Sequence, residues 1–79
     1  MDGNAIREEN VVHEVYFVNI QTDLQKPSYT ESIWETYDDA AECIRLQGFT
    51  KISDNLWGLQ SIFDGQIVRF ASISKQLLP

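Results

Sequence analysis

The chain has 79 residues, 43% of them hydrophobic and 23% charged, and its mean hydropathy is -0.26. A chain of this length buries only about 60% of the surface that it exposes when unfolded, which leaves room for one small domain. Its apolar content is too high for a disordered chain, and no apolar run approaches the roughly 20 residues that span a bilayer. We therefore predict one folded domain with no membrane partner.

Acidic residues are concentrated in the first half of the chain. The whole chain carries 12 acids and 6 bases, a net charge of -6. Residues 1–42 hold 10 acids and 2 bases (-8), whereas residues 43–79 hold 2 acids and 4 bases (+2). An acidic surface repels phosphate, which disfavours direct nucleic-acid binding. The asymmetry favours a protein partner with a basic surface.

The cysteine content and the N-terminal segment indicate a cytoplasmic protein. Cys43 is the only cysteine and cannot form an internal disulfide, which a small secreted domain normally needs. The segment 1–10, MDGNAIREEN, lacks the basic start and apolar block of a signal peptide. We expect this segment to be a flexible lead.

Two strands are predicted before the first helix. From Val11 to Ile20 the sequence is rich in β-branched and aromatic residues on both parities, which is typical of a central strand covered on two faces. A loop containing Pro27 follows. Residues 29–35 then alternate in polarity and predict a more exposed strand.

The segment TYDDAAECIRLQGF predicts a helix of about eleven residues. Thr36 or Asp38 can cap its first turn, where acids oppose the positive end of the helix dipole. Gly48 is placed to end the helix with a positive φ. Ala41 and Ile44 belong to its apolar stripe, and so short a helix needs a sheet to pack on.

The dipeptide Asp64-Gly65 separates two apolar runs and predicts a two-residue hairpin, since both central residues of a type I′ turn need positive φ. In that register Ile62 faces Ile67, and Trp57 faces Ser72. One sheet face then carries Trp57, Leu59, Phe63, Val68 and Phe70, and the other carries Leu56, Ile62, Ile67, Ala71 and Ile73.

A second tight turn is expected at Asp54-Asn55, after a short strand at residues 49–53. The predicted order is β-β-α-β-β-β, an α+β domain in which an antiparallel sheet of about five strands carries one helix on one face. This domain covers residues 11–74, with a C-terminal tail at 75–79.

One short helix cannot cover both faces of such a sheet. The uncovered apolar face is therefore a candidate surface for a protein partner or for a second copy of the chain. Its predicted members are Leu56, Ile62, Ile67 and Ile73, together with part of the first strand.

The acidic residues around the helix start form a second candidate surface. Five acids follow one another without an intervening base, and a tryptophan among them could anchor an interface. The residues are Glu31, Trp34, Glu35, Asp38, Asp39 and Glu42. They suit a basic protein surface, but ordinary solvation and helix capping also explain them, and their spacing is not that of an EF-hand.

Little in the sequence points to catalysis. His13 is the only histidine; it could meet Cys43 in space, but no third orienting group is evident. Paired CxxC units and the glycine-rich phosphate motifs are absent from the sequence. We predict a protein that is not an enzyme, with no catalytic residue, metal or cofactor.

The strand VYFVNI, the loop, and YTESIWETYDDAAECIRLQGF together resemble the layout of small bacterial and phage proteins with a "VYDSxExA" helix start. Tyr37, Asp38 and Ala41 match that start, and the resemblance covers residues 11–50. Such proteins share no agreed activity. The resemblance implies a small acidic cytoplasmic protein of phage or mobile-element type, a class whose bulk properties anti-CRISPR and other anti-defence proteins share.

Three functions are consistent with these features. The first is a protein-binding inhibitor of a host complex that handles nucleic acids. The second is a homodimeric accessory or assembly subunit that uses the uncovered apolar face. The third is a small ligand-binding domain or enzyme built around His13 at a dimer cleft.

Overall fold

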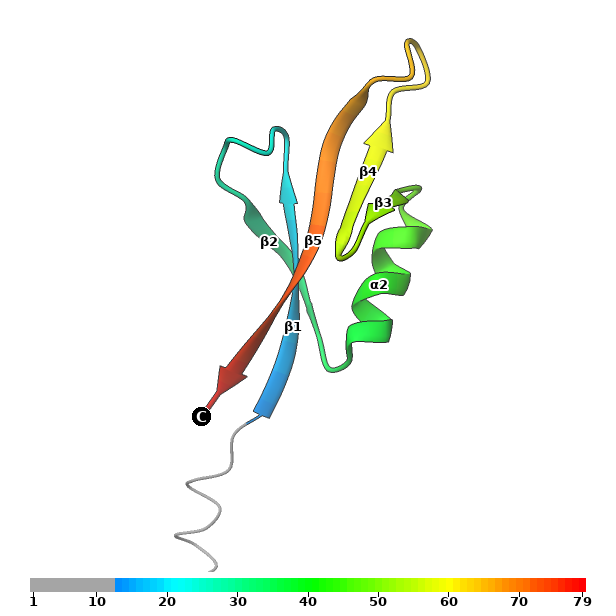
Figure 1. Ribbon diagram of the computed structural model, residues 1–79. Helices are drawn as coiled ribbons and strands as arrows, with labels where there is room; N and C mark the ends of the chain where they lie inside the picture. The colour runs from blue at the N-terminus through cyan, green and yellow to red at the C-terminus, as the bar shows by residue number, and fades with distance from the viewer. Residues whose placement is uncertain (1–12) are drawn as a thin grey trace, which may run out of the picture.

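The structure is a computed structural model that describes residues 13–79. Its elements are β1 (His13–Gln21), β2 (Tyr29–Trp34), α2 (Tyr37–Leu46), β3 (Thr50–Ser53), β4 (Leu56–Gln60) and β5 (Ile67–Leu78). The strands form one antiparallel sheet in the order β2-β1-β5-β4-β3, with α2 on one face (Figure 1). This confirms the predicted α+β fold and element order. The expected flexible lead at 1–10 lies outside the described residues.

The central ladder joins β1 to β5 from the His13–Leu78 pair to the Gln21–Phe70 pair. At its outer end, Lys75 and Glu14 form an ion pair of 2.6 Å across the two strands. Strand β5 continues to Leu78, so most of the predicted tail at 75–79 is strand. In Figure 1 the ends of β1 and β5 extend together, away from α2.

The helix begins and ends as its sequence predicts. The Thr36 hydroxyl caps the first turn by accepting a hydrogen bond from the Asp39 backbone N–H at 3.1 Å. Arg45 lies in the last turn, where the helix dipole favours a cation. Gly48 then adopts a φ of 96°, which stops the helix.

The core lies between α2 and the sheet face that it covers. Ile44 of the helix, Val18 and Ile20 of β1, and Trp57 of β4 are among its buried members. The full set is Val18, Ile20, Ala40, Ile44, Phe49, Trp57, Ala71 and Ile73. Every layer of the fold therefore contributes to one cluster.

The predicted register of the β4–β5 hairpin is wrong. The loop is wider than two residues, closed by a hydrogen bond from the Ser61 N–H to the Gln66 carbonyl at 2.8 Å. Asp64 does not adopt the positive φ that a type I′ turn needs, because its carboxylate instead accepts a hydrogen bond from the Gln66 N–H at 3.0 Å. Together with a bulge near Leu59, this pairs Trp57 with Ala71 instead of Ser72.

The tight turn predicted at Asp54-Asn55 is confirmed, and Asn55 has a φ of 54°. Its side-chain amide continues the sheet by bonding both backbone groups of Ile73. The Asn55 Nδ2 donates to the Ile73 carbonyl at 2.8 Å, and the Ile73 N–H donates to Asn55 Oδ1 at 3.1 Å. The Tyr37 hydroxyl also donates to this Oδ1, at 3.2 Å. Asn55 thus ties the turn to β5 and to α2.

We expect Asn55→Gly to lower the free energy of unfolding by about 1–3 kcal/mol, because glycine keeps the positive φ but leaves the Ile73 backbone groups without partners. Urea unfolding followed by circular dichroism measures the change. The matched control is Tyr37→Phe, which removes one of these hydrogen bonds from an exposed side chain and should cost less. Equal unfolding midpoints for Asn55→Gly and the original chain would contradict this role.

Candidate protein interface

The sheet face opposite α2, here called the open face, carries apolar side chains that no element among residues 13–79 covers. Successive strand residues alternate between faces, so Phe17 and Phe70 lie opposite the buried Val18 and Ala71. Ile33 of β2 pairs with Phe17 and is 56% exposed. The open face therefore presents apolar groups at its β2 edge.

A second apolar group on the open face lies at its β3 and β4 end. There the Ile52 and Ile67 side chains close over Gly58, where an added Cβ would lie 2.5 Å from Ile52 Cδ1 and 3.1 Å from Ile67 Cδ1. Ile52 is 47% exposed and Ile67 is 39% exposed. Between the two apolar groups, Asn19 donates to Ser74 Oγ at 2.9 Å and accepts from the Thr30 hydroxyl at 3.1 Å. The open face thus combines two apolar groups with a polar strip whose side chains hydrogen-bond to one another.

The structure separates the four residues predicted to form the uncovered apolar face. Leu56 and Ile67 lie on the open face, and Leu56 is half-buried. Ile62 lies in the β4–β5 loop. Ile73 is only 6% exposed and belongs to the core beneath α2. The shifted register explains the difference, because moving a strand pairing by one residue exchanges the two faces.

The end of the β4–β5 hairpin, here called the hairpin tip (residues 61–66), presents two large apolar side chains to solvent. Ile62 and Phe63 are each 92% exposed. The Ser61 hydroxyl accepts from the Phe63 N–H at 3.1 Å, and the Ser61 carbonyl accepts from the Gly65 N–H at 3.0 Å. In Figure 1 the tip projects beyond β3 and α2. Sequence reasoning missed it because a two-residue turn would have placed both side chains within the sheet.

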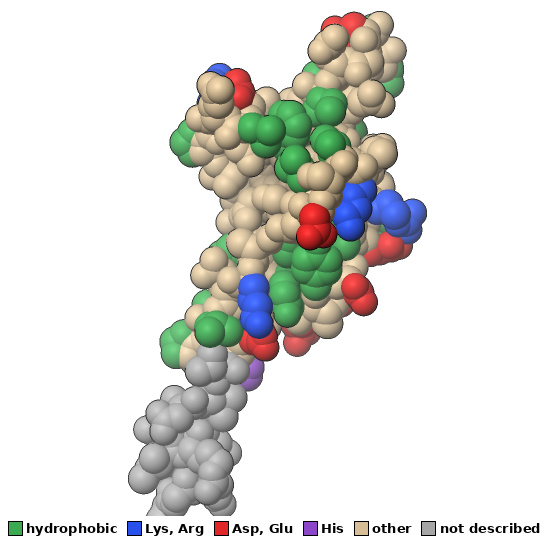
Figure 2. All heavy atoms as spheres, in the orientation of Figure 1, with side chains coloured by type: hydrophobic (Ala, Val, Ile, Leu, Met, Phe, Trp, Pro, Cys, Tyr) green, Lys and Arg blue, Asp and Glu red, His purple; other side chains and the backbone are tan. Residues whose placement is uncertain are grey.

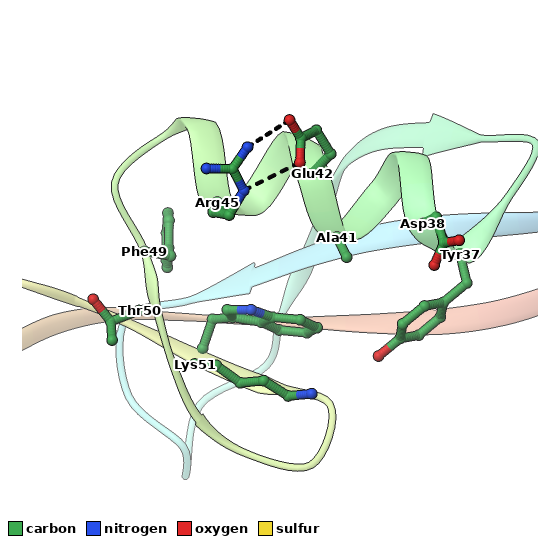
Figure 3. Close-up of a pocket in the computed structure, with 9 residues that line it drawn as sticks. Tyr37, Asp38, Ala41, Glu42, Arg45, Phe49, Thr50 and Lys51 are labelled. Atoms are coloured by element: carbon green, nitrogen blue, oxygen red, sulfur yellow. Dashed lines mark hydrogen bonds and ion pairs between the residues drawn. The ribbon is translucent and has the colours of Figure 1, made fainter.

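A groove of about 680 Å³ runs between α2 and the β3–β4 hairpin (Figure 3). Its apolar lining comes from Ala41 and Tyr37 of the helix, Phe49 after it, and Trp57 of β4. In Figure 2 hydrophobic side chains gather over the strands beside α2, with basic and acidic side chains next to them. This groove, here called the α2–β3 groove, was not predicted, since it depends on which face of β4 carries Trp57.

Charged side chains border the α2–β3 groove. The Arg45 guanidinium binds both carboxylate oxygens of Glu42, at 3.1 and 2.6 Å. The Lys51 ammonium lies 5.7 Å from the Trp57 ring centroid, in range of a cation–π interaction. Among residues 13–79, no carboxylate forms an ion pair with Lys51. An anionic group entering the groove would therefore find an available cation.

Tyr37 stands at the other end of the groove, with its ring edge-on to Tyr16 at a centroid distance of 6.2 Å. The pKa of its hydroxyl is raised above the ordinary value of 10.0, first because the ring is partly buried, then because Asp54 and Asp38 repel the phenolate. The folded chain therefore holds this proton more tightly than the unfolded chain does. The corresponding stability is present below about pH 10 and is lost as pH rises through the folded pKa.

We expect Asp54→Asn to lower the pKa of Tyr37 toward its ordinary value, because it removes one repulsive charge. Alkaline titration of the Tyr37 ring resonance by NMR measures the shift. Asp23→Asn in the β1–β2 loop is the matched control and should leave this pKa unchanged. A Tyr37 pKa that does not respond to Asp54→Asn would contradict the electrostatic contribution.

The predicted acidic surface is divided between the two sides of α2. Asp38 and Glu42 line the α2–β3 groove. Glu31 lies on the other side, where the Gln47 Nε2 donates to its carboxylate at 2.8 Å. Glu35 and Asp39 are exposed near the helix start. The six predicted residues thus do not form one continuous face.

Trp34, predicted as an interface anchor, is half-buried and packs against the core. Its indole N–H donates to the Ser32 hydroxyl at 2.8 Å. Most of its apolar surface and its polar atom are therefore used within the fold.

His13 and Cys43 lie in different surroundings. His13 pairs with Leu78 at the end of the β1–β5 ladder, whereas the Cys43 sulfur contacts Ser32 and Gln47. Within the described part of the chain, no group of three His, Cys, Asp or Glu side chains is placed to hold a metal ion. In the same residues no helix is long and apolar enough to cross a membrane.

Comparison of the chain with protein-family models, with curated proteins and with solved structures gives no match. The functional interpretation therefore depends on the surfaces described above.

Proposed function

We propose that the protein is a non-enzymatic protein-binding module and that the open face is its principal binding surface. The observation that carries the proposal is the exposure of Ile33, Ile52 and Ile67 on the sheet face that α2 does not cover. Apolar side chains exposed together on one face and bordered by polar residues are typical of protein interfaces. The polar strip at Asn19 already uses part of its hydrogen-bonding capacity internally, which lowers the cost of burying it beneath a partner.

The charge of the chain supports a partner with a basic surface. The net charge is -6, and Glu31, Glu35 and Asp39 are exposed outside the groove. Attraction between an acidic and a basic surface raises the association rate and selects against acidic partners. Basic surfaces are common on complexes that handle nucleic acids. We therefore propose, more specifically, that the protein inhibits such a host complex, as an anti-CRISPR or other anti-defence protein would.

The open face is tested by the double variant Ile33→Ser/Ile67→Ser. We expect it to weaken partner binding by about tenfold or more, because it removes apolar contact area from both groups of the open face. Its free energy of unfolding should fall by about 2 kcal/mol or less, since Ile33 is 56% exposed and Ile67 is 39% exposed. Capture from a lysate of the source cells, followed by titration of the captured partner, measures the affinity.

The matched control is Leu46→Ser, which removes a side chain that is 70% exposed on α2. It should bind the partner as the original chain does. Equal affinity of the open-face variant and the control would contradict the proposal. Loss of a homodimer in the open-face variant, measured by light scattering, would instead assign this face to self-association and favour the accessory-subunit alternative.

The acidic contribution is tested by Glu31→Lys/Glu35→Lys, since both carboxylates are exposed and lie outside α2. We expect this variant to slow association with a basic partner, and the difference from the original chain should shrink as salt rises. Glu31→Gln/Glu35→Gln separates loss of charge from reversal and should have a smaller effect. Association rates by surface plasmon resonance that are equal for all three chains would remove the support for a basic partner.

A further inference from the structure

We propose that the hairpin tip of one molecule inserts into the α2–β3 groove of a second copy, so that the protein self-associates through a contact that does not involve the open face. This proposal does not rest on the proposed function. Its two halves, a protruding apolar group and an apolar recess, lie on different parts of the same chain.

The hairpin tip combines exposed apolar side chains with an ordered backbone, which favours binding in an apolar recess. Its two apolar side chains, Ile62 and Phe63, are almost fully exposed, yet the loop that carries them is held by hydrogen bonds at both Ser61 and Asp64. The Gln60 side chain adds a hydrogen bond to the Gly65 carbonyl at 3.1 Å. A loop that is already ordered loses little conformational freedom when it binds. The polar backbone groups that these bonds satisfy need no partner in an apolar recess.

The groove matches the tip in size and polarity. Its volume of about 680 Å³ lies within the roughly 300–1,000 Å³ of pockets that take small ligands, enough for the ring of Phe63 and the side chain of Ile62. Aromatic side chains of Tyr37, Phe49 and Trp57 line it, and aromatic pairs are favoured beyond their buried area.

The charges also match at the Lys51 border of the groove, since the Glu42 carboxylate in its lining is already paired with Arg45. Asp64 follows Phe63 directly, and only one of its carboxylate oxygens is used within the described residues, by the Gln66 N–H. Lys51 borders the groove without a carboxylate partner in the same part of the chain. Phe63 in the groove would bring Asp64 to this border. Pairing of Asp64 with Lys51 would then compensate both charges.

The recess must belong to another molecule. Gln60, where β4 ends, is about 10 Å along the strand from Trp57, and the tip lies farther still. In Figure 1 the tip points away from α2, so it cannot turn back into its own groove. Reciprocal insertion closes a dimer, whereas insertion in one direction builds a chain of molecules.

Analytical ultracentrifugation from about 10 µM to about 1 mM, a range that includes weak protein affinities, tests the proposal. The average mass of the original chain should rise with concentration. Phe63→Asp and Lys51→Glu should each weaken self-association by about tenfold or more, because one removes the apolar group and the other reverses the available charge. Leu46→Asp, the control on an exposed helix position, should associate normally.

The most direct test mixes the Phe63→Asp and Lys51→Glu variants. The Phe63→Asp chain keeps an intact groove and the Lys51→Glu chain keeps an intact tip, so an equimolar mixture should form a heterodimer that neither forms alone. The charge-swapped chain Asp64→Lys/Lys51→Glu should recover self-association. Both altered side chains are exposed, and an amide NMR spectrum of each variant verifies the fold. If Lys51→Glu perturbs the fold, Lys51→Gln replaces it in the mixture.

A chain that stays monomeric over the whole range would overturn the proposal. So would a mass that is insensitive to Phe63→Asp, or a mixture that fails to associate. If Ile33→Ser/Ile67→Ser abolishes self-association while Phe63→Asp does not, the open face is the self-contact and the tip contact is wrong. Failure of partner capture in the earlier experiment leaves these outcomes unaffected, so the two proposals fail separately.

Discussion

The helix α2 is about 15 Å long, since each of its ten residues adds 1.5 Å, and it is the one helix among residues 13–79 available to cover a five-stranded sheet. The strands of such a sheet span about 19 Å from first to last, and β5 alone is about 40 Å long. The helix packs on β1, β2 and β5 and leaves the β3–β4 end of the same face without a helical cover. Both the α2–β3 groove and the open face follow from this limited coverage.

At the β3–β4 end of the sheet, side chains rather than α2 cover the core. Trp57 is buried although α2 packs mainly on β1, β2 and β5, because Phe49 belongs to the same core cluster and Lys51 extends across the Trp57 ring. Asn55 completes the backbone pairing in a similar way, since its amide takes the place of a strand neighbour for Ile73 just before β4 begins. These contacts bury Trp57 without filling the space between α2 and the β3–β4 hairpin. The limited length of α2 therefore explains both the packing around Trp57 and the α2–β3 groove.

Local signals predicted the elements well. The Thr36 cap, the Gly48 stop and the turn at Asp54-Asn55 each depend on residues close in sequence, and each forms as expected. The β-rich run at Val11 to Ile20 predicted a central strand covered on two faces. Strand β1 is internal to the sheet and buries Val18 and Ile20 beneath α2, but its other face belongs to the open face, so among residues 13–79 only one of the two faces is covered.

The candidate surfaces were predicted less well, because they depend on competition between local hydrogen bonds and turn type. The Asp64 carboxylate bonds the Gln66 N–H and Ser61 closes a wider loop, which shifts the pairing of β4 with β5. That shift moves Ile73 into the core and leaves Ile62 at the hairpin tip. A one-residue difference in the turn thus changed which apolar residues are available to a partner. The acidic run failed as a single surface for another reason, since the helix that begins within it sends its members to opposite sides.

Solvent accessibility of individual isoleucine side chains tests the central claim most directly, because isoleucines occur in the core, on the open face and at the hairpin tip. A soluble gadolinium chelate added to a dilute sample broadens the methyl NMR signals of exposed side chains. We predict strong broadening for Ile33, Ile52, Ile62 and Ile67, and protection for Ile20, Ile44 and Ile73. Protection of Ile62 together with broadening of Ile73 would contradict the register, and protection of Ile33 and Ile52 in a monomer would show that the face opposite α2 is covered.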